Sequence, residues 1–204
     1  MITQTKPCVK YIITESLRLF VACELSDEIR AALASVQDEL RNSGAGKLRW
    51  VRPEGIHITL KFLGQVESER VPEMTAALAS AIEPFRLRLA PARLGGFGGA
   101  RIRVVWVGVE GDTDGLASIA QQVERALTPL GYRAERRPFD SHLTLARVPD
   151  RMPASERLAL AGLVRDHRLA PLPSMVVTSV SLIQSVLGPE GSVYHKLATF
   201  PPET

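Results

Sequence analysis

Two copies of one short phrase constrain the fold of this chain more than any other feature. Residues 56–64 read IHITLKFLG and residues 141–147 read SHLTLAR, so a His-x-Thr-Leu phrase begins at His57 and again at His142, 85 positions later. Only four histidines occur in the 204 residues. Each phrase alternates apolar and polar residues, which is typical of a half-buried β-strand. If the flanking segments repeat as well, the phrases mark a repeated structural unit.

The flanking segments do repeat, because both halves of the chain predict the element order β-α-β-α-β. In the first half, Ser26 is suited to cap a helix whose stripe of apolar residues ends before a stop signal at 42–44. The predicted elements of this half are strands at 18–25, 56–62 and 85–90, with the first helix after Ser26 and the second at 68–82. The second half predicts strands at 102–109 and 142–146, helices at 112–128 and 154–167, a β-rich tail from Met175, and a hairpin of 180–187 with 192–200. Residues 95–99, GGFGG, predict a flexible loop because they lack the spacing of a dinucleotide site.

No linker separates the two halves, so we predict a single domain at 18–204 behind an N-terminal extension of residues 1–17. Within it, two interleaved lobes correspond to pseudo-repeats at about 18–93 and 102–178, followed by a C-terminal hairpin at 180–200. The chain is long enough for one sizeable core or for two small, intimately packed lobes.

Composition narrows the class of protein without choosing a function. No apolar run approaches the roughly 20 residues of a membrane span, and the N-terminus lacks a secretory signal, so we expect a cytoplasmic protein that does not bind membranes. The formal net charge is only +3, which is too small to indicate non-specific nucleic-acid binding. Cys8 and Cys23 show neither metal-ligand nor disulfide spacing, and we interpret both as free thiols.

Strand alternation places the polar residues of each phrase on one face. His57, Thr59 and Lys61 share a face opposite that of the apolar residues Ile56, Ile58, Leu60 and Phe62. In the second phrase, His142 and Thr144 point away from Leu143 and Leu145. If two equivalent lobes pair about an approximate two-fold axis, the two polar faces line one cleft.

Two imidazoles and two hydroxyls around one centre suit a phosphodiester. One imidazole can act as a general base and the other as a general acid near neutral pH. Thr59 and Thr144 can donate hydrogen bonds to the non-bridging phosphate oxygens. A 2′,3′-cyclic phosphate is an attractive substrate because its strained ring makes a metal less necessary.

Other interpretations of the histidines remain open at this stage. A single His-x-Thr phrase is more often a solvated polar face, so only the pair carries the hypothesis. A catalytic metal is the competing chemistry, but neither phrase brings a nearby carboxylate or a second histidine at ligand spacing. We place His167 at a helix end and His195 at the edge of packing, and we predict neither to be catalytic.

With these residues the sequence resembles the 2H phosphoesterase superfamily, specifically the RNA 2′,3′-cyclic phosphodiesterases, also called 2′-5′ RNA ligases. The resemblance extends from Arg18 to Pro201. It rests on RLFVACEL, LRWVRPEGIHITLKFLG, VVWVGV, SHLTLAR and YHKLATFPP.

The resemblance implies a bilobal α+β fold in which two pseudo-two-fold-related sheet lobes, with helices packed outside, enclose a central cleft. It also implies metal-independent hydrolysis of 2′,3′-cyclic phosphates to 2′-phosphomonoesters, with no cofactor. His57 would be the proton donor and His142 the proton acceptor, and Thr59, Thr144 and Arg147 would bind phosphate. Because strict alternation puts Arg147 on the leucine face, its role requires a bend or bulge at the strand end.

Further residues are predicted near the substrate. Asp140 and Ser141 replace a His-Pro pair that the family commonly has before its second motif, which affects the expected rim of the site. Phe20, Trp50 and Tyr194 are candidates for stacking on a base, although core packing also explains them. Lys61 is either an aid to phosphate attraction or a solvated charge.

The expected substrates are RNA 3′ ends or small cyclic nucleotides that carry a 2′,3′-cyclic phosphate, and we expect a monomer without an obligate protein partner. Two alternatives remain. One is a module that binds RNA ends without turnover. The other keeps the chemistry but joins RNA through a 2′-5′ bond, or cleaves 2′-5′ oligonucleotides or cyclic nucleotides.

Overall fold

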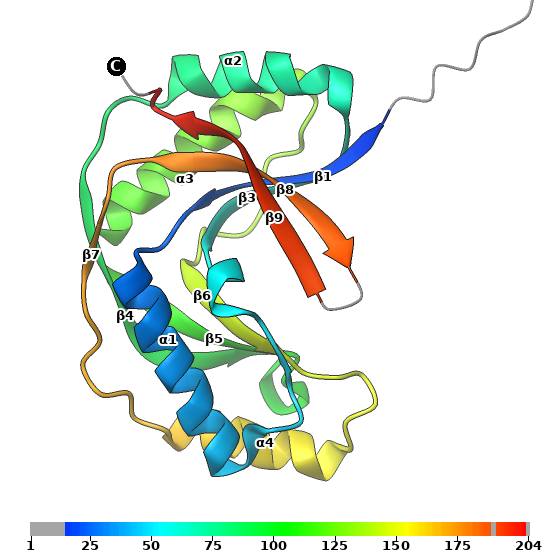
Figure 1. The fold of residues 1–204 in the computed structure, drawn as a ribbon, viewed down its shortest axis with the longest axis vertical. Helices are drawn as coiled ribbons and strands as arrows, with labels where there is room; N and C mark the ends of the chain where they lie inside the picture. Colours follow the sequence, from blue (N-terminus) through cyan, green and yellow to red (C-terminus); the bar gives the residue numbers. More distant parts are fainter. Residues whose placement is uncertain (1–14, 189–190, 203–204) are drawn as a thin grey trace, which may run out of the picture.

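Nine strands form one curved sheet in the computed structural model, which describes residues 15–188 and 191–202 (Figure 1). The strand order is β7-β4-β5-β6-β3-β1-β8-β9, all neighbours are antiparallel, and the short β2 pairs with β6. The strands are β1 (Ser16–Cys23), β2 (Arg49–Trp50), β3 (Ile58–Glu67), β4 (Leu87–Phe97), β5 (Val104–Gly111), β6 (His142–Arg147), β7 (Met175–Val177), β8 (Val180–Gly188) and β9 (Gly191–Phe200). The predicted terminal hairpin is confirmed as β8 and β9.

Four α-helices occupy the predicted positions: α1 (Asp27–Leu40), α2 (Val71–Ala81), α3 (Thr113–Leu127) and α4 (Ala154–Asp166). Ser26 caps α1 as predicted, because its hydroxyl accepts a hydrogen bond from the Ile29 amide at 3.3 Å. The helical path continues through one wider turn and breaks at Gly44, whose φ of 104° favours glycine. The predicted stop is therefore confirmed, with Gly44 as the residue that makes it. None of the helices in the described parts of the chain is long and apolar enough to cross a membrane.

The sheet has two halves that meet at a single residue pair. Strands β3 and β6 pair only at Ile58 and Leu143. On one side of this contact lie β1, β8 and β9 with β3, and on the other lie β4, β5 and β7 with β6. Helices α2 and α3 pack together over the first half, and α1 and α4 lie by the second (Figure 1). Each half of the sheet is therefore covered by one helix from each half of the sequence.

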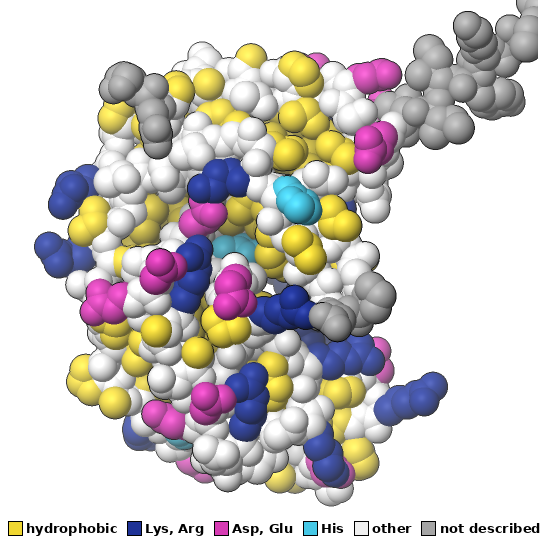
Figure 2. All heavy atoms as spheres, in the orientation of Figure 1, with side chains coloured by type: hydrophobic (Ala, Val, Ile, Leu, Met, Phe, Trp, Pro, Cys, Tyr) yellow, Lys and Arg dark blue, Asp and Glu magenta, His cyan; other side chains and the backbone are white. Residues whose placement is uncertain are grey.

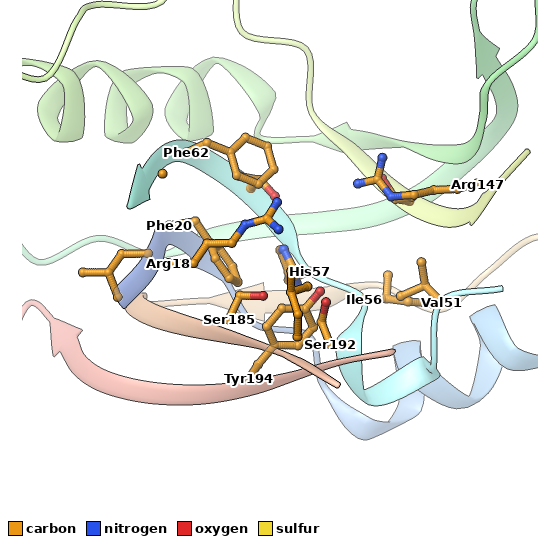
Figure 3. A pocket seen from close by; sticks show the side chains of 16 residues that line it. Arg18, Phe20, Val51, Ile56, His57, Phe62, Arg147, Ser185, Ser192 and Tyr194 are labelled. Carbon is orange, nitrogen blue, oxygen red and sulfur yellow. The ribbon is translucent and has the colours of Figure 1, made fainter. Parts of the chain in front are cut away.

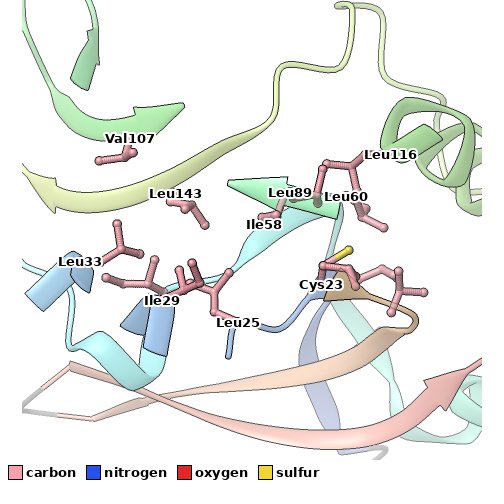
Figure 4. Close-up of a cluster of buried hydrophobic side chains, with 14 of the residues drawn as sticks. Cys23, Leu25, Ile29, Leu33, Ile58, Leu60, Leu89, Val107, Leu116 and Leu143 are labelled. Atoms are coloured by element: carbon pink, nitrogen blue, oxygen red, sulfur yellow. The ribbon is translucent and has the colours of Figure 1, made fainter. Parts of the chain in front are cut away.

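One buried apolar cluster continues through both halves. Leu60 and Leu116 are buried beside β1 at one end of Figure 4, and Leu33 of α1 lies with Val107 and Leu143 at the other. Cys23 is a free buried thiol within this cluster, and desolvation raises its pKa to about 12. Cys8 and most of the predicted N-terminal extension lie outside the described residues.

Each His-x-Thr strand contains a β-bulge directly after its threonine. In the β1–β3 pair, Thr59 lies opposite Ala22 and Lys61 opposite Val21, so β3 has one extra residue at this point. In the β5–β6 pair, Thr144 lies opposite Trp106 and Ala146 opposite Val105, which leaves Leu145 as the extra residue. A bulge moves the following side chains to the other face of the strand.

Three sequence-based expectations need correction. The alternation that placed Phe62 in the core is wrong, because the bulge turns Phe62 outward and leaves it 67% exposed. The predicted loop at 95–99 is largely strand, since Gly95, Gly96 and Phe97 pair with β5. Glycine is required at 95 because a Cβ there would lie 2.3 Å from the Trp106 ring. The first strand begins at Ser16, two residues before its predicted start.

Candidate active site

A cavity of about 500 Å³ opens on the concave side of the sheet, where its two halves meet. Figure 2 shows a hollow between the upper and lower parts of the molecule, with Lys and Arg side chains along its lower edge. The cavity is lined by Arg18, Leu19, Phe20, Val51, Gly55, Ile56, His57, Thr59, Phe62, Gly64, Thr144, Arg147, Ser185, Leu187, Ser192 and Tyr194. From the first phrase His57 and Thr59 reach this space, and from the second Thr144 and Arg147 do. His142 is not among the lining residues, but its ring lies close enough to His57 to act on the pKa of that imidazole.

His57 lies just before β3, packed between two aromatic rings. Phe20 of β1 stacks on it with ring centroids 4.5 Å apart and planes 23° apart, and Tyr194 of β9 meets it edge-on at 5.3 Å. The pKa of His57 is lowered to about 4, chiefly by burial and to a smaller extent by the nearby His142. A hydrogen bond to the Gly55 backbone and the charge of Glu24 act in the opposite direction. His57 is therefore neutral at pH 7 in the ligand-free protein.

His142 begins β6 and is held by a comparable set of contacts. Its Nδ1 lies 2.8 Å from the Asp140 carbonyl oxygen. Because a carbonyl only accepts, Nδ1 must carry the hydrogen, which leaves the lone pair of the neutral ring on Nε2. Phe97 meets the ring edge-on at 4.8 Å, and Trp106 lies 6.2 Å away.

The two histidines are thus oriented by the same kind of contact with the main chain. Each ring is hydrogen-bonded to the main chain two residues before it, at Gly55 for His57 and at Asp140 for His142. The replacement of a His-Pro pair by Asp140 and Ser141 does not disturb this contact, since the acceptor is a carbonyl oxygen. At Gly55 a side chain is excluded, because a Cβ would lie 2.9 Å from Tyr194 Cε2.

The bulges decide which other side chains reach the cavity. Thr59 and Thr144 line it as alternation predicts. Arg147 lines it because the bulge at Leu145 brings it to the face of Thr144. The bend that this residue required is therefore present. Phe62, at the corresponding position in the first phrase, lines the cavity for the same reason.

Lys61 is turned away from the cavity, and both interpretations given to it need correction. The bulge in β3 places this side chain, 6% exposed, against α3. Its Nζ lies 2.6 Å from Glu124 Oε2 and donates to the Arg133 carbonyl oxygen at 2.8 Å. Lys61 is thus a buried structural cation, neither solvated nor available to phosphate.

The three aromatic candidates have different positions. Trp50 does not line the cavity: its ring packs against the core with the Arg41 guanidinium 4.7 Å above it, while the next residue, Val51, takes the cavity side. Phe20 lines the cavity but is buried beneath His57. Tyr194 lines the cavity and also packs against His57. It therefore has both a packing contact and a place in the site, which sequence reasoning treats as alternatives.

Several cavity residues were missed by sequence reasoning. Figure 3 shows Arg18 and Arg147 on opposite sides of His57, with Ser185, Ser192 and Tyr194 below it. Arg18 begins the apolar run of β1, and Ser185 and Ser192 come from the terminal hairpin. Arg18 opens the segment RLFVACEL but was given no role there, and the two serines lie outside the quoted segments. The pairing of β1 with β8, and of β8 with β9, brings the three residues to the site.

The remaining histidines lie elsewhere. His167 follows α4, as predicted, with its Nε2 3.6 Å from Glu39 Oε2. His195 is exposed on β9, so its predicted place at the edge of packing is wrong. Across residues 15–188 and 191–202, no three His, Cys, Asp or Glu side chains gather in a way that could hold a metal ion.

Comparisons with known proteins agree on one family. The family model described as LigT like Phosphoesterase matches residues 24–106 and 107–194. An RNA 2′,3′-cyclic phosphodiesterase of Archaeoglobus fulgidus is 34% identical over 186 residues, which are 90% of this chain and 99% of the relative. One from Aeropyrum pernix is 38% identical over 167 residues, 81% of this chain and 92% of the relative.

Solved structures show the same fold. TT0787 of Thermus thermophilus superposes with a TM-score of 0.69 and 28% identity over 92% of this chain and 100% of that chain. E. coli LigT in its apo form gives a TM-score of 0.69 and 26% identity over 92% of this chain and 98% of that chain. Together with the family model, these relatives show that the chain belongs to the LigT-like family of 2H phosphoesterases.

Proposed function

We propose that this protein hydrolyses the 2′,3′-cyclic phosphate ends of RNA to 2′-phosphomonoesters, using paired histidines and no metal. The observation that carries the proposal is that His57 and Thr59 line one cavity with Thr144 and Arg147 of the second phrase. His142 lies close enough to His57 to act on its pKa, and its Nδ1 is held by the Asp140 carbonyl oxygen. The RNA substrate is taken from the names of the relatives, which are RNA 2′,3′-cyclic phosphodiesterases.

In the proposed reaction, His142 acts as general base through Nε2. It removes a proton from water as the water oxygen attacks phosphorus. The P–O3′ bond breaks, and His57 donates a proton to the departing O3′, which leaves the phosphate on O2′. Thr59, Thr144 and Arg147 stabilise the charge on the non-bridging oxygens.

The low pKa of His57 must be reconciled with a role as proton donor. At pH 7 the free protein holds this ring neutral. A bound cyclic phosphate is an anion, and an opposite charge next to an imidazole raises its pKa. We infer that the substrate brings the catalytic proton to His57, so binding and protonation are coupled.

The test is product analysis on a panel of cyclic-phosphate nucleotides and short RNAs, in the presence of EDTA. We expect 2′-phosphomonoesters, and His57→Ala or His142→Ala should each lower turnover by at least about a hundredfold. His195→Ala, on the exposed face of β9, is the matched control. Near-normal rates in either cleft variant would refute the assignment, and loss in EDTA with recovery on adding a divalent ion would favour a metal mechanism.

The same panel separates the alternative functions. Unchanged RNA together with measurable binding would indicate an RNA-end-binding module. Joined products with a 2′-5′ bond would indicate a ligase, and cleavage confined to 2′-5′ oligonucleotides would indicate a different phosphodiesterase.

A further inference from the structure

The catalytic cavity continues into a second hollow. This hollow, of about 330 Å³, is lined by Glu15, Ser16, Arg18, Gln65, Gln184, Ser185, Val186 and Leu187. Arg18, Ser185 and Leu187 line both spaces. The two spaces therefore adjoin along these three residues, and together they form a groove that leads away from His57.

Three strands build this groove. Arg18 lies opposite Gln65 in the β1–β3 pair, and the neighbouring residue Leu19 lies opposite Gln184 of β8. Ser185 follows on β8, and Leu187, 68% exposed, lies near the end of that strand. The groove therefore lies on paired strands, which are more rigid than a loop.

Arg18 is the cation at the junction of the two spaces. Its side chain is exposed, and among the described residues it forms no ion pair or hydrogen bond. The acidic residue of the groove, Glu15, lines only the second hollow and does not reach the junction. An unpaired guanidinium in a groove beside a phosphate-binding centre suits a second phosphate group.

We propose that the second hollow binds the nucleotide that precedes the cyclic-phosphate nucleotide, and that Arg18 binds the phosphodiester joining the two. This inference rests on the proposed function. Ser185 offers a hydroxyl to the same phosphate. Gln184 presents an amide that can both donate and accept, as recognition of a base edge or a 2′-hydroxyl requires. Gln65 accepts from the Ser16 hydroxyl through Oε1 at 3.1 Å and offers its amide NH₂ as a donor. The exposed side chain of Leu187 covers the apolar part of the nucleotide.

The consequence concerns the class of substrate. A mononucleotide 2′,3′-cyclic phosphate has no phosphodiester for Arg18 and no group for the second hollow. A dinucleotide with the same cyclic end has both. We therefore expect the protein to prefer RNA ends of two or more nucleotides to cyclic mononucleotides.

The experiment compares kcat/KM for a dinucleotide and for a mononucleotide, both with a 2′,3′-cyclic phosphate and the same terminal base. We expect the dinucleotide to be favoured about tenfold, the size of one hydrogen bond to a charged group. Arg18→Gln should reduce this ratio to near one, and the control Arg125→Gln on the exposed side of α3 should preserve it. In R18Q, the slope of the logarithm of the dinucleotide binding constant against the logarithm of salt concentration should also become shallower by roughly 0.7. That change corresponds to the loss of one phosphate contact to a single strand.

Two outcomes would overturn the proposal. In the first, the wild-type protein shows no preference for the dinucleotide. In the second, R18Q lowers kcat/KM equally for both substrates, which would place Arg18 at the cyclic phosphate itself. If neither substrate is turned over, the proposed function fails. The subsite is then judged from the dissociation constants of the corresponding mono- and dinucleotide 2′-phosphates, whose ratio should still depend on Arg18.

Discussion

The two histidines occupy nearly identical phrases but different surroundings. His57 is packed between Phe20 and Tyr194, and burial lowers its pKa to about 4. His142 has Phe97 at its edge. These aromatic residues come from three different strands, so the phrase alone predicts that the histidines meet without predicting how their environments differ. A pair of titratable groups in unequal environments is what separates a general acid from a general base.

Binding of a phosphodiester anion should therefore take up a proton. A group with a lowered pKa is neutral at pH 7, and a bound anion raises that pKa, so a fraction of a proton, up to one, enters on binding. Calorimetric titration with a non-hydrolysable cyclic phosphonate, in buffers of different ionisation enthalpy, measures this uptake. The affinity should rise as the pH falls from 7 towards 5. His57→Gln should abolish the uptake, and an observed enthalpy independent of buffer would contradict the prediction.

The identity of the proton donor can be tested through the leaving group. A p-nitrophenolate departs without protonation, so a variant that lacks the general acid should lose little activity on a p-nitrophenyl phosphodiester. We expect His57→Ala to lose much less on this ester than on a 2′,3′-cyclic phosphate, whereas His142→Ala should lose about a hundredfold on both. The reverse pattern in initial rates would exchange the two roles.

At the scale of elements, periodicity predicts the helices and most strands, yet it cannot predict the two bulges. A bulge depends on the register between two strands, and one strand's sequence does not contain that register. Phe62 and Lys61 were therefore assigned to the wrong faces, and Arg147 reached the cavity only through a bend that the sequence left open. Arg18 was missed for a related reason, since its place in the site depends on the pairing of β1 with β8.

Each bulge has its own buried polar support. The Lys61 ammonium holds Glu124 and the Arg133 carbonyl beside the first bulge. At the second, the bulged residue Leu145 has a carbonyl oxygen that accepts from the Val51 amide at 2.9 Å and from Gln37 Nε2 at 3.0 Å. Gln37 also donates to the Val51 carbonyl oxygen at 2.8 Å. This one buried amide therefore stabilises the bulge that directs Arg147 into the cavity.

Gln37→Leu should weaken both stability and catalysis. It removes the donor from two carbonyl oxygens, and we expect the free energy of unfolding to fall by about 1–3 kcal/mol. We also expect a lower kcat, because Arg147 loses its fixed position. Urea denaturation and steady-state kinetics measure these effects, and Gln121→Leu on the exposed face of α3 should change stability by no more than about 0.5 kcal/mol. A fully stable and active Q37L would show that the bulge does not need this support.

At the scale of the molecule, the two halves of the sheet are joined by little direct strand pairing but by a shared core. Strands β3 and β6 meet only at Ile58 and Leu143. The covering helices cross between halves (Figures 1 and 4). Helix α1 follows β1, yet its Leu33 lies with Val107 of β5 and Leu143 of β6. Helix α3 follows β5, yet it packs against β3. Separation of the halves would therefore expose the apolar faces of two helices and of the sheet beneath them.

The protein should for this reason unfold as one unit, despite its repeated organisation. Trp50 and Trp106 both lie in the half with β4 to β7, so their fluorescence in urea reports that half. Amide exchange of β1 and β8 reports the other. We expect coincident midpoints, as in a two-state transition, and we expect residues 102–202 expressed alone to remain unfolded because α3 would lose the strands it covers. Two separated transitions, or a folded fragment with the β5–β6 pairing intact, would show that each half carries a sufficient core of its own and that the crossed helices are not what unites them.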